Sequence, residues 1–291
     1  MRGTKRKTYI GIIKRNRLSL DELEKYYRDR RAAKYEAGKP IRGIFFRKVI
    51  HVPIIGILKL YHHICPVKLR ILYNNSEKKK RPTIYAATHV CWDDIEYAMD
   101  AITEQAYLFW GDPRELYRSF AGALLNLNGC IICDTQYKRD RFVAKETAIK
   151  LLDAGGNLLL FPEGVWNTSE NKLVNYLFPG IAEMAIRIKV DIVPIAIERT
   201  EKGFDIAIGK SIESKSFDME DKWMLLQEIR DAMATLKWDV LEASGLHRRI
   251  EIPPNYSAIF KNRFIEEARG ISDWIAFEKQ EFHPKDIIDH W

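Results

Sequence analysis

The sequence predicts an α/β fold in which a mixed, mostly parallel sheet is covered by helices and preceded by a basic, helical N-terminal region. Two observations favour it. First, after residue 82 short apolar runs alternate with longer segments of helical composition. Second, before residue 82 Lys and Arg greatly outnumber Asp and Glu. The overall composition, 46% hydrophobic and 30% charged residues in 291, is typical of a soluble protein with a sizeable core.

The individual elements follow from local composition. Asp21–Ala37 lacks β-branched residues and is followed by Gly38-Lys39-Pro40, which favours a helix that ends there. The short apolar runs predict strands at Thr83–Thr88, Gly129–Cys133, Asn157–Phe161, Asp191–Glu198 and Phe204–Ile208. Helical composition or periodicity predicts further helices at Asp94–Thr103, Arg141–Ala154, Gly180–Lys189 and Asp221–Ala243. Pro194 indicates an edge position or an irregular end for its strand.

Charge divides the chain into two regions. Residues 1–81 carry 23 basic and 6 acidic residues, a net charge of +17, whereas residues 82–291 carry 24 and 34, a net charge of −10. The polar, cationic segment Asn74–Pro82 is the expected boundary between a basic N-terminal region, 1–81, and an α/β body with a helical C-terminal extension, 82–291. The basic region predicts an anionic partner, which could be nucleic acid, a membrane surface or a phosphorylated substrate.

A mixed apolar and cationic stretch, Ile44–Leu72, predicts a segment that lies at a membrane interface, and the alternative is a pair of helices packed on the body. Its longest uncharged apolar run, Val49–Leu58, is shorter than a transmembrane helix requires. Met1–Arg17 lacks the apolar run and cleavage site of a signal peptide. Four cysteines in a chain of this length do not indicate a disulfide scaffold, so we expect a reducing compartment.

His89 is the first candidate for chemistry. It lies at the end of the predicted strand Thr83–Thr88, and Asp94 lies five residues later, where a helix is expected to begin. A carboxylate there can turn back toward the imidazole, fix its tautomer and stabilise the imidazolium that forms when His89 takes a proton. Asp93 could do the same, because spacing alone does not choose between them. The simpler alternative is a structural histidine at a strand end.

A second candidate segment consists of Phe161, Pro162, Glu163 and Gly164, directly after the apolar run Asn157–Phe161. Pro and Gly favour a rigid turn. The turn would place Glu163 at the carboxyl end of a strand, where ligands bind in open α/β sheets. Its carboxylate could then orient a ligand hydroxyl or the basic groups around it. Taken alone, the segment is better explained as an ordinary strand-to-helix connection.

The two segments and Val193–Ile197 (Val-Pro-Ile-Ala-Ile) resemble, in order and spacing, the glycerolipid acyltransferase family, whose best-known members are 1-acyl-glycerol-3-phosphate acyltransferases. The resemblance covers roughly Thr83 to Arg199 and includes Gly129–Thr135 as the family's intermediate block of glycine and apolar residues. The chain is thus identified as a divergent member of this family.

The resemblance implies an O-acyltransferase. His89, paired with Asp94, would take the proton of an acceptor hydroxyl, whose oxygen would attack an acyl thioester without an acyl-enzyme intermediate. Backbone N–H groups of the following helix would meet the oxyanion. The donor would be acyl-CoA or acyl carrier protein, and the acceptor a lysophospholipid or related lipid. No cofactor or metal is implied. With the basic region, the resemblance predicts peripheral binding to an anionic membrane surface on its cytoplasmic side.

Several positions depart from the family pattern. Thr88 and Cys91 stand where Asn and often Ser occur, and Thr135 and Trp166 stand where the family usually has Arg for the acceptor's phosphate. Nearby cations could compensate, or the acceptor could lack a phosphomonoester, in which case Trp166 would suit a less charged group or a sugar face. The expected substrate-binding residues are Phe161, Pro162, Glu163, Gly164, Trp166, Lys138, Arg139 and Arg141.

Other interpretations remain open. A nucleic-acid binding protein would explain the basic region but neither motif, so no nucleic-acid partner is expected. An esterase or thioesterase-like hydrolase would use Cys91 or His89, although the chain has no Gly-x-Ser-x-Gly elbow. Cys130 and Cys133 have the spacing of a metal or redox pair, but positions i and i+3 of a strand point to opposite faces. Residues 253–291 are interpreted as a capping or docking extension.

Overall fold

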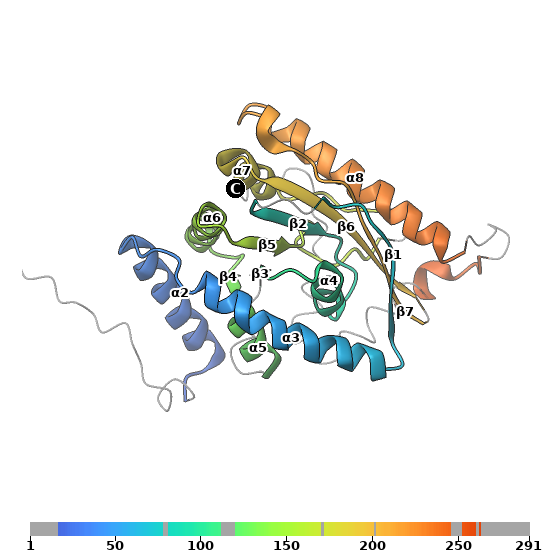
Figure 1. The fold of residues 1–291 in the computed structure, drawn as a ribbon, viewed down its shortest axis with the longest axis horizontal. Helices are drawn as coiled ribbons and strands as arrows, with labels where there is room; N and C mark the ends of the chain where they lie inside the picture. The colour runs from blue at the N-terminus through green and yellow to red at the C-terminus, as the bar shows by residue number, and fades with distance from the viewer. Residues whose placement is uncertain are drawn as a thin grey trace, which may run out of the picture.

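The computed structural model describes residues 17–77, 81–111, 120–169, 172–200, 202–245, 252–259 and 262. In these residues, a seven-stranded sheet lies between two layers of helices (Figure 1). The strands are β1 (Lys68–Asn74), β2 (Thr83–Ala87), β3 (Ala106–Gly111), β4 (Cys130–Cys133), β5 (Asn157–Leu160), β6 (Asp191–Thr200) and β7 (Gly203–Ile208). The helices are α2 (Leu20–Glu36), α3 (Ile44–Ile64), α4 (Asp94–Ile102), α5 (Phe120–Asn128), α6 (Lys138–Asp153), α7 (Gly180–Ile188) and α8 (Lys222–Ala243), with a short 3-10 turn, η2 (Ser214–Ser216).

The strand order is β1-β7-β6-β2-β5-β3-β4. The five strands from β6 to β4 are mutually parallel, β7 runs antiparallel to β6, and β1 runs parallel to β7. The sheet is therefore mixed and mostly parallel, with helices on both faces, and the predicted fold class is confirmed. The parallel core is what brings the carboxyl ends of β2 and β5 to the same edge.

Each face of the sheet has its own hydrophobic core. On one face, Ala148 of α6, Ile181 of α7 and Ile229 of α8 belong to a single buried cluster. On the other face, Ile95 of α4 lies in a second cluster, against which Leu58 of α3 packs. Figure 1 shows α7 and α8 above the sheet and α3, α4 and α5 below it. This layering leaves the strand ends free for chemistry.

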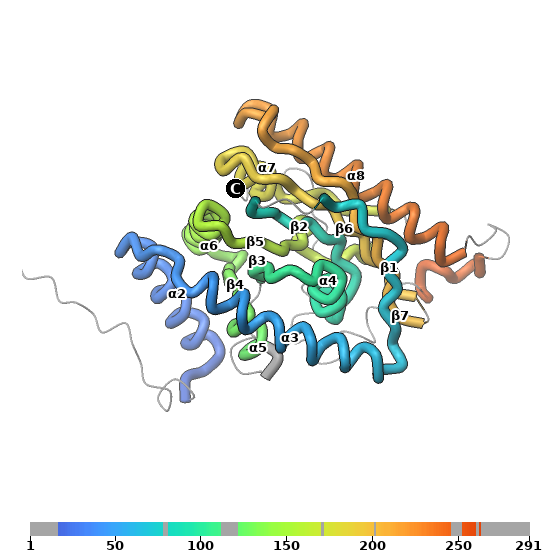
Figure 2. Tube along the Cα trace, in the orientation of Figure 1, coloured from blue at the N-terminus to red at the C-terminus, as the bar shows by residue number. Residues whose placement is uncertain are grey.

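All five predicted strands and five predicted helices occur close to their predicted bounds, whereas β1, β3 and α5 were not predicted. The six residues of β3 are mostly buried and carry no polar–apolar alternation, so their periodicity gives no signal. For the mixed stretch Ile44–Leu72, the sequence predicts an interfacial segment, with a pair of helices as the alternative. The structure places the single helix α3 there, followed directly by the start of β1 (Figure 2).

Pro194 lies inside the sheet, so the expected edge position is wrong. Its strand β6 pairs with β2 on one side and β7 on the other, and Pro194 is in register with Ala86 of β2. The β6–β7 ladder begins one residue later, at Ile195, and the carbonyl of Pro194 accepts from the N–H of Gly209 just beyond β7. A proline is tolerated here because the ladder with β7 ends at this point.

The boundary predicted at residue 81/82 falls between β1 and β2, two strands of one sheet. β1 pairs with β7 over six register positions, from Lys68 opposite Gly203 to Asn74 opposite Ile208. Residues 68–74 are therefore part of the α/β body and not of a separate helical region. The rest of the predicted division into an N-terminal region and a body stays a prediction. The extension predicted at 253–291 lies outside the described residues, except for 253–259 and 262.

The basic helix α2 is held against the acidic body by ion pairs. Arg28 Nη1 lies 2.6 Å from Asp134 Oδ2, and Arg31 makes a two-point contact with Asp140 at 3.0 and 2.6 Å. Both guanidinium groups are largely buried at these contacts. Part of the positive charge of the N-terminal region therefore neutralises carboxylates of the body instead of facing an external partner.

Helix α3 contacts the body through polar groups. Its two buried residues are His51 and His62. His51 Nδ1 lies 2.8 Å from Asn128 Oδ1, and His62 Nδ1 lies 2.7 Å from Asp100 Oδ2. Among the helices of the described residues, none is long and apolar enough to cross a membrane. Leu58 of α3 also packs against the body, whereas Phe45, Ile57 and Ile64 are exposed.

We predict that Gly203→Ala destabilises the protein because β1 packs tightly on the β6–β7 turn. Gly203 has φ +146°, and a Cβ at this position would lie 1.9 Å from the carbonyl oxygen of Lys68. Overpacking of this kind costs about 1–3 kcal/mol, which urea unfolding can measure. The control is Gly56→Ala in α3, where nothing lies within 4 Å and no loss is expected. Equal stability of the two variants would contradict this account of β1.

Candidate active site

The candidate site lies at the carboxyl edge of the parallel strands. His89 follows the end of β2 by two residues, and Glu163 follows the end of β5 by three. Because β2 and β5 are parallel neighbours, the two residues come together, and the N–H of His89 donates to Glu163 Oε1 at 3.1 Å. The two sequence motifs, which are more than 70 residues apart, thus form one structural unit.

Asp94 is the carboxylate that partners His89. Its Oδ2 lies 2.9 Å from His89 Nδ1 and also accepts the N–H groups of Val90, at 2.7 Å, and Cys91, at 3.2 Å. Asp94 is completely buried, whereas the alternative Asp93 is exposed and occupies the N-cap position of α4. Because α4 begins at Asp94, Asp94 and not Asp93 is turned toward the imidazole of His89, a choice that the sequence left open.

This geometry defines the protonation pattern of the imidazole. A carboxylate accepts hydrogen bonds, so the proton of a neutral His89 ring resides on Nδ1, and Nε2 carries a lone pair. The side chain of His89 is 18% exposed, while that of Asp94 is wholly buried. The arrangement can take up a proton at Nε2 and stabilise the resulting imidazolium through Asp94.

The backbone N–H groups of the two residues directly after His89 are already occupied, whereas the expected oxyanion donors belong to the helix that follows. Those of Val90 and Cys91 donate to Asp94 and cannot also meet an oxyanion. In the first turn of α4, the N–H groups of Glu96 and Tyr97 donate to the carbonyl of Asp93 at 3.0 and 3.4 Å, so the expected role would fall to the N–H groups of Asp94 and Ile95.

Glu163 is buried and its two carboxylate oxygens each accept a backbone N–H. Oε1 accepts from His89, and Oε2 accepts from Asn175 at 2.7 Å. Burial raises the pKa of the Glu163 carboxyl, while these two N–H donors and nearby Lys237 act in the opposite direction. The side chain therefore joins the His89 segment to the chain that follows β5, and its oxygens are committed to the backbone.

The turn at 161–164 has the rigidity expected from its sequence. The N–H of Gly164 donates to the carbonyl of Phe161 at 3.0 Å, and the N–H of Phe178 donates to the carbonyl of Pro162 at 2.8 Å. Gly164 has φ +70°, and a Cβ there would lie 2.3 Å from the Phe178 ring. Asn167 adds another link, since its N–H donates to the carbonyl of His89 at 2.8 Å.

Aromatic rings surround the imidazole. The rings of Phe161 and Trp166 lie 4.4 and 6.1 Å from that of His89, between centroids. The sequence predicts that Trp166 meets the acceptor. In the structure Trp166 is buried, with 6% exposure, so its ring face is not open to an acceptor. Trp92 is 41% exposed and lies edge-to-face with both Trp166 and Trp110. Sequence reasoning missed Trp92 and Trp110; the position of Trp92 between His89 and Asp94 was the available signal.

The cations expected to replace the family arginines have partners of their own. Arg139 forms an ion pair with Glu36 of α2, and Arg141 Nη1 donates to the carbonyl of Thr135. Lys138 is exposed at the start of α6. Among the described residues, none of their recorded contacts involves His89, Asp94 or Glu163. Their role in substrate binding stays a prediction.

Burial raises the pKa of the thiols of Cys91, Cys130 and Cys133 and so disfavours their thiolate forms. Cys91 is buried, and burial, together with the Asp94 charge, raises the pKa of its thiol to about 12. Cys130 and Cys133 face the two different cores of the sheet, as predicted for positions i and i+3 of a strand. No group of three or more His, Cys, Asp or Glu side chains within the described residues could hold a metal ion. A protonated Cys91 thiol is a poor nucleophile at neutral pH.

Comparison with known proteins relates part of the chain to a family. Residues 70–198 match the family model described as Acyltransferase, and the domain that they form belongs to this family. Comparison with the curated proteins finds no match to the sequence. Among solved structures, the chain is similar to the 1-acyl-sn-glycerophosphate (LPA) acyltransferase PlsC from Thermotoga maritima, with a TM-score of 0.55 and 18% identity. The match covers 70% of this chain and 83% of the other. The chain therefore contains an acyltransferase domain, and its fold is shared with this distant structural relative.

We predict that Asp94→Asn lowers kcat for acyl transfer about 10²- to 10⁴-fold, because an amide cannot stabilise the imidazolium as a carboxylate does. Asp93→Asn is the matched control, since this neighbouring carboxylate is exposed and does not contact the ring. We expect it to retain near wild-type kcat. Steady-state rates of both variants test whether Asp94 is the partner of His89. A larger loss of kcat in Asp93→Asn than in Asp94→Asn would contradict this assignment.

For Glu163→Gln, we predict a fall in kcat of at least about tenfold with little change in the acceptor KM, because the amide can accept only one of the two backbone N–H groups and His89 loses its fixed position. Glu146→Gln, at the ion pair between α6 and Arg187 of α7, serves as the control because it changes another largely buried carboxylate. A raised acceptor KM with unchanged kcat would instead show that Glu163 binds the acceptor directly.

Proposed function

We propose that this acyltransferase moves a fatty acyl group from acyl-CoA or acyl carrier protein to a hydroxyl of a lysophospholipid or related lipid acceptor. The observation that carries the proposal is the His89–Asp94 pair, held at the carboxyl edge of the sheet by three hydrogen bonds to one carboxylate oxygen. A base of this kind suits an oxygen nucleophile, whose proton must leave as the new bond forms.

The proposed reaction uses His89 twice. Nε2 takes the proton of the acceptor hydroxyl while the hydroxyl oxygen attacks the carbonyl carbon of the thioester. The electrons of the C=O bond move onto the carbonyl oxygen. When the tetrahedral intermediate collapses, the C–O bond remains, the C–S bond breaks and the leaving thiolate takes the proton back from the imidazolium. Asp94 stabilises the charged ring between these steps. No acyl-enzyme forms, which agrees with the buried, protonated Cys91.

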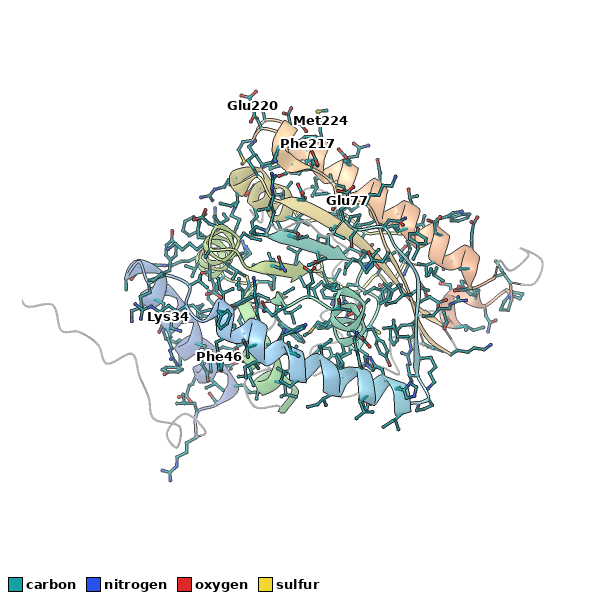
Figure 3. The ribbon with its side chains drawn as sticks, in the orientation of Figure 1. Lys34, Phe46, Glu77, Phe217, Glu220 and Met224 are labelled. Carbon is teal, nitrogen blue, oxygen red and sulfur yellow. The ribbon has the colours of Figure 1, made fainter. Side chains whose placement is uncertain are left out.

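We propose that α3 lies at an anionic membrane surface. Its body-facing side includes His51, Leu58 and His62, whereas many of its other large apolar side chains are exposed. The most exposed are Phe45, Ile64 and Ile57, at 80, 74 and 71%; Phe46, near the start of α3, is 56% exposed (Figure 3). An exposed apolar stripe flanked by cations is the pattern of an interfacial helix.

This placement supports a peripheral enzyme on the cytoplasmic side, where acyl thioesters are available, because the acceptor lies in the bilayer and the donor in water. Lys48 and Lys59 lie on α3, and the anionic headgroups of the cytoplasmic leaflet attract such side chains. Nucleic-acid binding explains neither the apolar stripe nor the His89–Asp94 pair, so no nucleic-acid partner is proposed.

The surroundings of His89 favour an acceptor whose reacting end is weakly charged. Thr135 and the buried Trp166 occupy the positions at which family arginines bind phosphate, and Arg139 and Arg141 are engaged within the protein. Trp92 presents an exposed indole beside the site, and such a ring suits a sugar face or glycerol better than a phosphomonoester.

Product mass tests the proposal directly. The full chain is incubated with a long-chain acyl-CoA, or acyl carrier protein, and a panel of monoacylglycerol, lysophosphatidate and other lysophospholipids. We expect an acylated lipid as the product and an activity loss of at least about 10²-fold in His89→Ala, which removes the base. Near wild-type transfer by His89→Ala, or release of free fatty acid regardless of the acceptor, would contradict it.

A further inference from the structure

Helix α8 carries two cations, Arg230 and Lys237, on the side that faces the body. They are seven residues apart, which is close to two helical turns, so both point in the same direction and lie roughly 10 Å apart along the helix axis. Figure 1 shows α8 running beside β6, the strand that pairs with β2. The proposed reaction leaves both cations without a role.

Lys237 is a buried lysine with two partners in the second half of β6. It is 5% exposed, its Nζ donates to the carbonyl of Ile197, and it forms an ion pair with Glu198 Oε2 at 2.6 Å. The side chain of Glu198 is 21% exposed, so solvent reaches this carboxylate while the ammonium group is shielded. Burying an ammonium group costs free energy unless negative charge compensates it, so Lys237 needs negative charge in the interior around it.

The carbonyl that Lys237 holds also fixes the residue before His89. Thr88 Oγ1 donates to the carbonyl of Ile197 at 3.2 Å and accepts the N–H of Ile197 at 2.9 Å. The side chain of Thr88 thus continues the ladder between β2 and β6 one residue beyond the end of β2. The backbone of His89 can therefore turn away from β6 and bond to the segment that follows β5.

Arg230 acts in the same way on the chain beside Glu163. Its Nε donates to the carbonyl of Asn175 at 3.1 Å, and its Nη2 donates to the carbonyl of Val174 at 3.2 Å. The N–H of Asn175 in turn donates to Glu163 Oε2 at 2.7 Å. Arg230 therefore fixes the peptide groups next to one oxygen of Glu163, whereas Lys237 acts on the strand that pairs with β2.

Lys237 also compensates the charge of Glu163. Glu163 is buried, and burial raises the pKa of its carboxyl, whereas two backbone N–H donors and the charges of Lys237 and His89 lower that pKa. Only the ionised carboxylate accepts an N–H at each oxygen without carrying a proton of its own. Loss of the Lys237 charge would therefore weaken the bond between Glu163 and the N–H of His89.

We infer that Lys237 and Arg230 are positioning residues of the active site, through which α8 holds Glu163 and the end of β2 so that the backbone of His89 keeps its place. Both act through other residues and not on the reacting atoms. Their effect falls on kcat, because a displaced base raises the barrier without changing how the lipid binds. The inference deepens the proposed function, on which its kinetic test rests, whereas its structural test does not depend on the reaction.

The test compares two shielded lysine–glutamate pairs. Lys237→Met with Glu198→Gln replaces the pair on β6 by neutral side chains of similar size, a change that commonly leaves a protein folded. Lys145→Met with Glu183→Gln is the control: this pair, between α6 and α7, has the same 2.6 Å separation and side chains that are 15 and 13% exposed. Arg230→Met removes the second cation at a half-buried position and tests the inference by itself should the first variant not fold.

Kinetics give the first readout. In the Lys237 variant we expect kcat for acyl transfer to fall about tenfold with little change in the acceptor KM, whereas the control variant keeps near wild-type kcat. In a Glu163→Gln background the same change should cost about threefold or less, because the charge that needs compensation is absent and only the contact with β6 is lost. An equal loss in both backgrounds, or an equal loss in the control variant, would overturn the inference.

Amide hydrogen exchange gives a second readout that needs no turnover. We expect the backbone N–H of His89 to exchange about tenfold faster in the Lys237 variant, and that of Asn175 in the Arg230 variant, relative to Leu159 in β5, which pairs on both sides. Equal acceleration at Leu159, as a merely structural role predicts, or unchanged exchange at both sites would overturn the inference. Absence of transfer by the wild-type protein, together with the expected exchange, would count against the proposed function alone.

Discussion

The structure of the active-site edge depends on one buried carboxylate oxygen. Asp94 Oδ2 is shared by the imidazole of His89 and the N–H groups of Val90 and Cys91, so it determines both the orientation of the ring and the path of the chain around it. Glu163 plays the complementary part by joining the His89 backbone to the strand that lies next to β2. Two buried acids, one at the start of α4 and one just after β5, thus position one base. Buried charges are costly unless hydrogen-bonded, and both acids meet backbone donors.

A second constraint concerns the N-terminal helices, whose positive charge serves two purposes. Arg28 and Arg31 hold α2 to carboxylates of the body, whereas the cations of α3 and early β1 lie beside exposed apolar side chains. Helix α3 is attached to the body by histidines and turns its apolar side outward. The same attachment that fixes α3 therefore leaves the surface that the proposed membrane function requires.

The sequence predicted the α/β class and the pairing of His89 with a nearby acid because these follow from local pattern and spacing. It could not choose between Asp93 and Asp94, since that depends on the phase at which α4 begins. It could not find the burial of His51 and His62, because their partners Asn128 and Asp100 come from other helices. It placed β1 outside the body, since strand pairing with β7 is decided more than 120 residues away. The shielding of Trp166 likewise arises from tertiary packing.

The central claim is that Asp94 fixes His89 as a base with a free Nε2, and nitrogen-15 NMR of the His89 ring tests this most directly. In the resting enzyme, at a pH where the ring is neutral, we predict a proton on Nδ1 and an unprotonated Nε2, with the Nδ1 proton shifted by its bond to the carboxylate. The opposite tautomer, with the proton on Nε2, would contradict the account, because that nitrogen could not then accept a proton from the acceptor hydroxyl.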